Sequence, residues 1–304
     1  MKEHITGLIA APLVPLNKDL TVNFPVIPKY VDFLYRNGVK GAFVNGTNGS
    51  GMLLALHDRK KIAEQWMDAA PSDFKIIIHT GHTSLTDQII LAKHAQDIGA
   101  FGFATMAPMF IKPTTIEQLV NHSALEAAGA PDLPYYFYHL PSISGVYLSM
   151  RKFLESADDK IPNLAGIKFS QLDPVEANRC INFKDGKYNI LWGHDENLLP
   201  AMSLGIRGAV GSNYNWVAPL YNQIMEHFLN GNLQKARELQ EISINIVNAL
   251  FHVSNFRGGS KEIMRWLGID LGPVMSPLFE IDEEESRWLH SRLKSINFFE
   301  YANK

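Results

Sequence analysis

Short apolar runs alternate along most of the chain with longer segments whose apolar residues recur every three or four positions. A short apolar run indicates a buried strand, whereas apolar residues at three- or four-residue spacing indicate an amphipathic helix. We expect eight strands, at 8–14, 41–45, 75–79, 102–106, 134–138, 165–169, 189–193 and 208–211. Their continuous apolar character favours parallel strands that are covered on both faces.

The segments between these runs read as helices that end at residues such as Gly38, Pro71, Gly99 and Gly129. We expect helices at 26–37, 58–70, 84–98, 115–128, 175–183, 196–204, 219–229, 233–253, 261–267 and 283–299. Repeated strand–helix units predict a (β/α)8 barrel in residues 1–230, with a helical extension in residues 231–304 packed on it. A doubly wound open sheet is the alternative, but the turn after the first strand lacks the glycines of a dinucleotide site.

Composition excludes several classes of function. The chain has 304 residues with 28 basic and 31 acidic side chains, a balance that argues against nucleic-acid binding. Its longest apolar run, 7–16, is too short to cross a membrane. Cys180 is the single cysteine, so an intramolecular disulfide is excluded. We therefore expect a cytoplasmic protein whose partners are small molecules, and neither nucleic acid nor membrane.

Two side chains at strand ends are candidate catalytic groups, because the catalytic groups of a barrel lie at the carboxyl ends of its strands. Lys168 lies inside the sixth expected strand, where desolvation would lower its pKa and leave a neutral amine able to attack a carbonyl. The alternative is a lysine that reaches solvent or pairs with a carboxylate. Tyr138 ends the preceding strand and is either a proton-transfer phenol or an ordinary core tyrosine.

Further strand ends carry polar groups. The glycine-rich 46–51 loop could present N–H groups and hydroxyls to an anion, or be a simple turn. Asp195 and Glu196 could accept hydrogen bonds from sugar hydroxyls or cap a helix. A metal-dependent hydrolase is an alternative, although no HExxH motif is present. It would use the strand-end histidines His79, His82, His139 and His194 as metal ligands.

In order and spacing, these motifs resemble the N-acetylneuraminate lyase and dihydrodipicolinate synthase family of class I aldolases. The family's Gly-Ser/Thr-Thr-Gly-Glu loop is similar to 46–50, its Tyr-x-x-Pro strand end to 138–141, and its lysine strand to 166–170. The resemblance covers nearly the whole chain and includes the helical tail. It implies a homotetramer that uses neither a metal nor an organic cofactor.

The resemblance also implies roles for individual residues. Lys168 would form a Schiff base with the ketone carbon of a 2-oxo acid, and Tyr138 would transfer protons. Thr47 and the backbone of Asn48 would hold the substrate carboxylate, with the Thr47 hydroxyl in the proton relay. The other expected substrate contacts are Ser170, Gly193, Asp195, Glu196 and Ser212.

Within the family, the 193–196 turn resembles the sugar-binding turn of the lyase branch, which cleaves N-acetylneuraminate reversibly to N-acetylmannosamine and pyruvate. The synthases carry an arginine five residues after the tyrosine, where this chain has Ile143, which cannot pair with a second carboxylate. Two alternatives stay open. One is another aldolase or dehydratase of the family acting on a keto-deoxy sugar acid, and the other is a non-catalytic sugar-acid binding protein.

Three departures from the family pattern bear on the proton path. Asn48 replaces a hydroxyl residue, and Ser50 replaces the loop glutamate. Phe110 stands where many members have a tyrosine lent by a neighbouring subunit. We therefore expect the relay to run through Thr47, water or the substrate.

Overall fold

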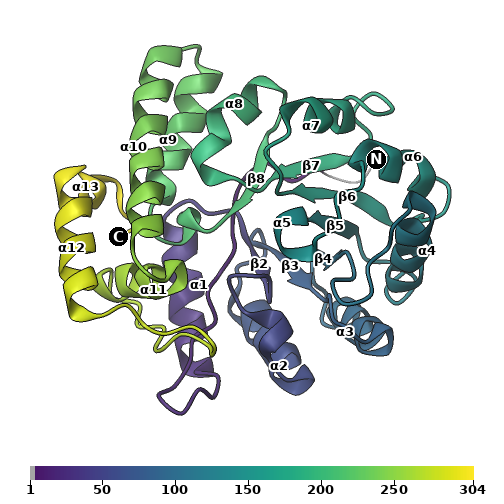
Figure 1. The fold of residues 1–304 in the computed structure, drawn as a ribbon, viewed down its shortest axis with the longest axis horizontal. Coiled ribbons are helices and arrows are strands. Elements are labelled where there is room, and N and C mark those ends of the chain that lie inside the picture. The colour runs from purple at the N-terminus through teal and green to yellow at the C-terminus, as the bar shows by residue number, and fades with distance from the viewer. Residues whose placement is uncertain (1–3) are drawn as a thin grey trace.

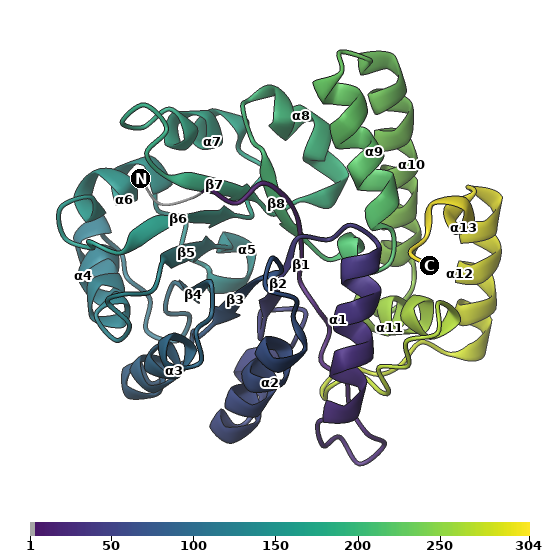
Figure 2. The same ribbon diagram turned by 180° about the vertical axis from the view of Figure 1, so that it is seen from behind.

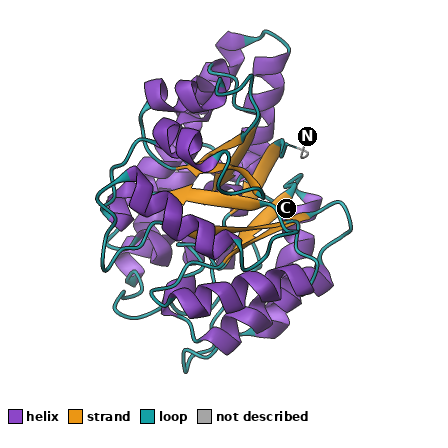
Figure 3. Ribbon diagram, turned by 90° about the vertical axis from the view of Figure 1, so that its right-hand side faces the viewer, coloured by secondary structure: helices purple, strands orange, loops and turns teal. Residues whose placement is uncertain are grey.

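The computed structural model describes residues 4–304, in which eight parallel strands close into a barrel in chain order. The strands lie at the centre of the molecule and helices surround them (Figure 3). The strands are β1 (Gly7–Ala10), β2 (Gly41–Val44), β3 (Lys75–His79), β4 (Gly102–Met106), β5 (Tyr135–His139), β6 (Leu164–Phe169), β7 (Asn189–Trp192) and β8 (Gly208–Gly211). The predicted (β/α)8 barrel is confirmed, and the open-sheet alternative is wrong.

Helices follow the strands around the barrel and then continue on one side of it (Figure 1). The helices of the barrel are α1 (Ile27–Arg36), α2 (Leu56–Ala69), α3 (Leu85–Asp97), α4 (Ile116–Ala127), α5 (Pro141–Ser144), α6 (Met150–Ala157), α7 (Pro174–Ile181), α8 (Leu198–Ser203) and α9 (Ala218–Leu229). The tail forms α10 (Leu233–His252), α11 (Phe256–Trp266), α12 (Glu283–Ser295) and α13 (Phe298–Tyr301).

The structure differs from the expected elements in four places, and three of these have a physical cause. β1 stops at Ala10, because Pro12 has no N–H to continue the ladder. α11 begins at Phe256 rather than at 261, since Gly258 and Gly259 pack closely inside the helix instead of ending it. The expected helix at 283–299 divides where Asn297 adopts a left-handed backbone conformation, with φ 59°. Sequence reasoning missed α5 and α6 between β5 and β6.

Two layers of apolar side chains hold the barrel. One cluster fills its interior and includes Phe43, Tyr136 and Tyr138. The other lies between the strands and the helices, and it contains both Leu8 of β1 and Leu289 of α12. The tail therefore packs on the barrel through a shared core. Seen from behind, α10, α12 and α13 lie together beyond α9, away from β3–β6 (Figure 2).

The end of the chain is fixed to the barrel by backbone hydrogen bonds. The Asn303 N–H donates to the Trp216 carbonyl over 2.8 Å, and its side-chain oxygen accepts from the Ala218 N–H over 2.8 Å. These contacts anchor the tail beside the segment that leaves β8. Among residues 4–304, no helix is long and apolar enough to cross a membrane.

Candidate active site

Lys168 points into the barrel from β6. Only 4% of the residue is exposed, and its Nζ lies 4.0 Å from the centre of the Tyr138 ring and 4.1 Å from that of Phe43. Burial lowers the pKa of the Lys168 amine, while Tyr138 and Asp195 act in the opposite direction. A desolvated amine has a larger neutral fraction and is therefore a better nucleophile.

Tyr138 and Lys168 are direct neighbours in the β5–β6 register, so two adjacent strands present them to the same space. The Tyr138 hydroxyl lies 3.5 Å from Thr47 Oγ1, at the outer limit of a hydrogen bond. The Tyr138 ring also meets the rings of Phe43 and His79 edge-on, with centroids 5.4 and 5.9 Å away. An amine, a phenol and a hydroxyl therefore converge from β6, β5 and the loop after β2.

The 46–51 loop is held in place by groups around it. Asn45 takes a left-handed conformation, with φ 60°, and its amide donates to the Arg59 carbonyl over 2.9 Å. The buried Arg59 guanidinium in turn donates to the carbonyls of His79 and Gly81, over 2.7 and 2.9 Å. Helix α2 thereby ties the ends of β2 and β3 together and fixes where Thr47 lies.

Asn48 joins the loop after β2 to the ends of β1 and β8. Its amide nitrogen donates to Ser212 Oγ over 2.7 Å and to the Ala11 carbonyl over 3.2 Å. The Asn48 side chain, which replaces the family's second hydroxyl residue, is thus hydrogen-bonded to other residues of the protein. Its backbone N–H remains the group through which Asn48 is expected to contact a carboxylate.

Ser170 and Gly193 face each other across the ends of β6 and β7. A Cβ at Gly193 would collide with Ser170 Oγ, so the glycine makes room for the hydroxyl. Within residues 4–304, Ser170 Oγ is buried and has no hydrogen-bond partner. A buried hydroxyl of this kind is suited to a bound polar ligand.

The adjacent acids after β7 have different environments. Asp195 is 4% exposed, and its Oδ2 accepts hydrogen bonds from the backbone N–H and the side-chain amide of Asn213, both over 2.8 Å. Burial raises the pKa of Asp195. Burial acts in the same direction on Glu196, but a hydrogen bond from His194 brings the pKa of Glu196 below its usual value. Asp195 is thus part of the barrel wall, whereas Glu196, with a third of its side chain exposed, reaches the mouth.

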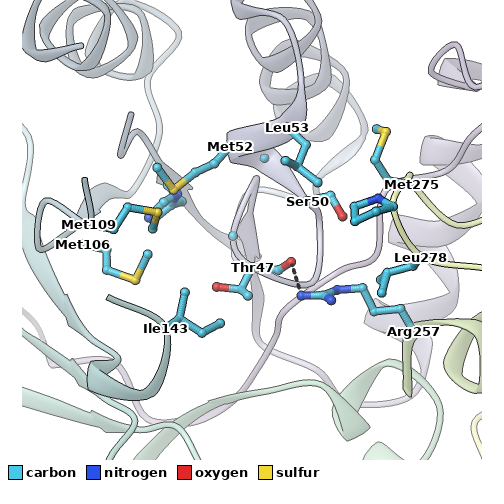
Figure 4. A pocket seen from close by; sticks show the side chains of 14 residues that line it. Thr47, Ser50, Met52, Leu53, Met106, Met109, Ile143, Arg257, Met275 and Leu278 are labelled. Atoms are coloured by element: carbon cyan, nitrogen blue, oxygen red, sulfur yellow. Dashed lines mark hydrogen bonds between the residues drawn. The ribbon is translucent and has the colours of Figure 1, made fainter. Parts of the chain in front are cut away.

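A cavity of about 300 Å³ opens beside Thr47 at the barrel mouth (Figure 4). Its walls are mainly apolar and come from the ends of β3 and β4, the segments after β2 and β4, helix α5, the start of α11 and the segment after α11. The lining includes Met52, Met106, Met109, Ile143, Met275 and Leu278. None of the expected sugar contacts on the β6–β8 side lines this cavity. Of these contacts, Ser212 is joined to the Thr47 loop through Asn48.

One residue at this cavity was not predicted from the sequence, and a second was considered there only as a metal ligand. Arg257 extends from α11 and donates to the Thr47 carbonyl over 3.2 Å, which brings a guanidinium beside the loop (Figure 4). Burial lowers the pKa of Arg257. His79 also lines the cavity, and burial together with Arg59 and Lys168 lowers its pKa to about 3, so its imidazole is neutral. The position of His79 at a strand end was a signal, whereas nothing in the pattern marked Arg257.

The strand-end histidines do not form a cluster. Among the residues that the structure describes, no group of three or more His, Cys, Asp or Glu side chains could hold a metal ion. His139 bonds to Gln171 over 2.7 Å, and His194 bonds to Glu196 over 3.3 Å. The metal-dependent hydrolase therefore has no ligand set in residues 4–304.

The departures from the family pattern occupy distinct places. Ser50 adopts a left-handed conformation, with φ 51°, and lines the cavity. Ile143 lines it from the opposite side. Phe110 and its neighbour Ile111 are 86% and 82% exposed, so they lie outside the site formed by this chain.

Comparison with known proteins places the chain in a family. The model of the dihydrodipicolinate synthetase family matches residues 4–296. The chain belongs to this family. It is similar to the N-acetylneuraminate lyase of Pongo abelii, with 37% identity over 306 residues that cover 99% of this chain and 96% of the relative.

Solved structures of the family give the same picture. The N-acetylneuraminate lyase of Proteus mirabilis superposes with a TM-score of 0.94 at 37% identity, covering 97% of this chain and 100% of that one. The N-acetylneuraminate lyase (sialic acid aldolase) of Aliivibrio salmonicida also has a TM-score of 0.94, at 36% identity, covering 97% and 98%. The resemblance inferred from the motifs is therefore confirmed across nearly the whole length of the family fold.

Proposed function

We propose that this protein is a class I aldolase that cleaves N-acetylneuraminate reversibly to N-acetylmannosamine and pyruvate. The observation that carries the proposal is the buried Lys168 amine, which packs against the ring of Tyr138 at the end of β6. The similarity to N-acetylneuraminate lyases over 99% of the chain supports the choice of substrate.

In the proposed reaction, the neutral Lys168 amine attacks C2 of the open-chain sugar acid. The Tyr138 phenol gives its proton to the hydroxyl of the carbinolamine, which leaves as water, so that an iminium forms. The Tyr138 phenolate then takes the proton of the C4 hydroxyl, and the C3–C4 bond breaks. Its electron pair moves into the iminium, which yields an enamine and the aldehyde N-acetylmannosamine.

The second half of the reaction restores the enzyme. C3 of the enamine takes a proton from the Tyr138 phenol. Water then hydrolyses the resulting iminium to pyruvate and the free Lys168 amine, and the proton that this hydrolysis releases returns to the Tyr138 phenolate. Thr47 Oγ1, which lies 3.5 Å from the Tyr138 hydroxyl, extends the proton relay toward the substrate carboxylate. The lysine iminium is the electron sink, so the proposed mechanism uses no metal or organic cofactor.

We assign the substrate carboxylate to the loop after β2 and the sugar to the β6–β8 side of the mouth. Thr47 and the Asn48 backbone N–H hold the carboxylate, beside the Arg257 guanidinium that donates to the Thr47 carbonyl. The groups that orient the sugar are Ser170, Gly193, Asp195, Glu196 and Ser212. Fixed positioning of this kind can lower a barrier by several kcal/mol.

We further propose a homotetramer located in the cytoplasm. The exposed Phe110 and Ile111 form an apolar surface suited to contact with another copy, and the single free cysteine, Cys180, fits a reducing compartment. Light scattering on a sizing column should give about four times the mass of one chain. A monomeric mass would contradict this assembly.

Turnover with defined substrates tests the proposed activity. We expect pyruvate release from N-acetylneuraminate, measured with a coupled dehydrogenase, to exceed in kcat/KM that from other keto-deoxy sugar acids. The matched control for the loss of a lysine side chain is Lys235→Ala, because Lys235 is a half-exposed lysine of α10 whose side chain pairs with Glu238. Higher kcat/KM for a different keto-deoxy sugar acid would favour the alternative aldolase or dehydratase. Tight binding without pyruvate release would favour a binding protein.

A further inference from the structure

Lys261 is a second buried lysine, and it lies on α11 outside the proposed chemistry. It is 5% exposed, and its Nζ donates to three backbone carbonyls: Val14 over 2.7 Å, Leu271 over 3.0 Å and Pro273 over 2.5 Å. An ammonium has three N–H donors, so all of them are used. Among residues 4–304, no carboxylate lies within ion-pair distance of Lys261.

The three carbonyls belong to two segments that are far apart in the sequence. Val14 lies on the segment that leaves β1, whereas Leu271 and Pro273 follow α11. The same junction is closed by the Leu16 N–H, which donates to the Leu271 carbonyl over 2.9 Å. Gly272 makes this approach feasible: its φ is +64°, and a Cβ there would collide with the Leu16 carbonyl oxygen.

The segment after this junction forms one wall of the cavity beside Thr47. That cavity is lined by Met275, Pro277 and Leu278, and Met275 lies two residues after Pro273 (Figure 4). One helical turn before Lys261, Arg257 bonds to the Thr47 carbonyl. Two cationic side chains of α11 thus hold both the cavity wall and the loop that is expected to bind the carboxylate.

We propose that Lys261 is a positioning residue that fixes the 275–278 wall against the substrate by binding the three carbonyls of this junction. The ammonium does not contact the reacting atoms. It determines where the wall lies relative to the Thr47 loop, and hence how well the part of the substrate beyond the pyruvate unit fits. The identity of that substrate rests on the proposed function, whereas the role of Lys261 in holding the wall does not.

Lys261→Met tests the inference, because methionine has similar volume and no donor. We expect the KM for N-acetylneuraminate to rise by about tenfold to a hundredfold, with kcat per active site changed much less. Active sites are counted by borohydride trapping with pyruvate alone, which needs Lys168 but not the wall. The matched control, Lys235→Met, should leave both constants unchanged. An unchanged KM together with a lower melting temperature would overturn the positioning role.

Amide hydrogen exchange gives a readout that is independent of the substrate. In Lys261→Met, we expect faster exchange at 14–16 and 271–278 while β3–β6 stay protected. If the wild type does not cleave N-acetylneuraminate, the proposed function fails, yet faster exchange here would still support the role of Lys261. Unchanged exchange in both segments would overturn it. If Lys261→Met does not fold, Gly272→Ala displaces the same junction with the ammonium present and should raise KM in the same way, and an unchanged KM would again contradict the inference.

Discussion

Two buried lysines occupy opposite environments in this barrel. Lys168 and Lys261 are 4% and 5% exposed, and burial lowers the pKa of both amines. Lys168 lies against the rings of Tyr138 and Phe43, whereas the donors of Lys261 bind three carbonyls. Burial alone therefore does not make a lysine reactive. The neighbouring groups decide whether the amine is available to a substrate or engaged in holding the fold.

Removing the first amine should have the largest effect. Lys168→Ala eliminates the nucleophile, and we expect turnover to fall by at least about 10⁴-fold, as for other lost nucleophiles. The fold should remain, because the strand is held by its backbone ladder to β5 and β7. Pyruvate release and circular dichroism of the same preparation check both statements. Turnover within tenfold of wild type would assign the chemistry to another group.

Removing the phenol should have a smaller effect that separates two steps. Tyr138→Phe keeps the ring that packs on Lys168 and loses the oxygen near Thr47. We expect cleavage to slow by about 10²- to 10⁴-fold, the usual contribution of a proton-transfer group, and the pyruvate imine to form with a much smaller loss. Rapid-quench trapping with borohydride measures the imine. Equal losses in both steps would mean that Tyr138 supports binding or folding instead.

The two lysines should also respond oppositely in stability. Lys261→Met removes the side-chain donor from three carbonyls, of which that of Leu271 keeps the Leu16 N–H, and we expect the free energy of unfolding to fall by about 3 kcal/mol. Lys168→Met exchanges an amine for a thioether between two aromatic rings, so we expect no loss, or a gain of up to about 1 kcal/mol. Urea denaturation measures both. A comparable loss in the two variants would show that the environments are not as different as we argue.

The pH dependence of imine formation tests whether Lys168 is desolvated when it reacts. Because burial lowers the pKa of Lys168 below its ordinary value of 10.5, the rate with pyruvate should rise about tenfold per pH unit and level off below pH 10.5. Asp195→Asn removes a carboxylate that favours the charged amine, so the profile should move to lower pH. A profile that still rises at pH 10.5 would mean that Lys168 is not desolvated when it reacts.

The sequence predicted one of these lysines and not the other, for a physical reason. Lys168 interrupts an apolar strand, and the parallel register places it beside Tyr138, so a local pattern was sufficient. Lys261 lies on a helix that was predicted to begin only at 261, and its partners are backbone carbonyls of distant segments. Backbone groups have no signature in a sequence. Arg257 escaped for the same reason, since its partner is the Thr47 carbonyl.

The fold shows a similar limit to what the sequence could predict. Their order and approximate ends followed from apolar runs, whereas α5 and α6 were missed, and the cavity on the Thr47 side was not foreseen. That cavity is assembled from the ends of β3 and β4, the segments after β2 and β4, helix α5, α11 and the segment after it, and among these the 46–51 loop alone carried a motif. Long-range packing, rather than local propensity, creates it.

Peptide mass spectrometry after borohydride treatment with N-acetylneuraminate as the only ketone is the most direct test of the central claim. We expect a pyruvyl-sized adduct on the peptide that contains Lys168 and none on the peptide that contains Lys261. That result requires both imine formation at Lys168 and cleavage of the carbon–carbon bond. An adduct on Lys261, or no adduct with either N-acetylneuraminate or a pyruvate control, would contradict the assignment of Lys168 as the nucleophile.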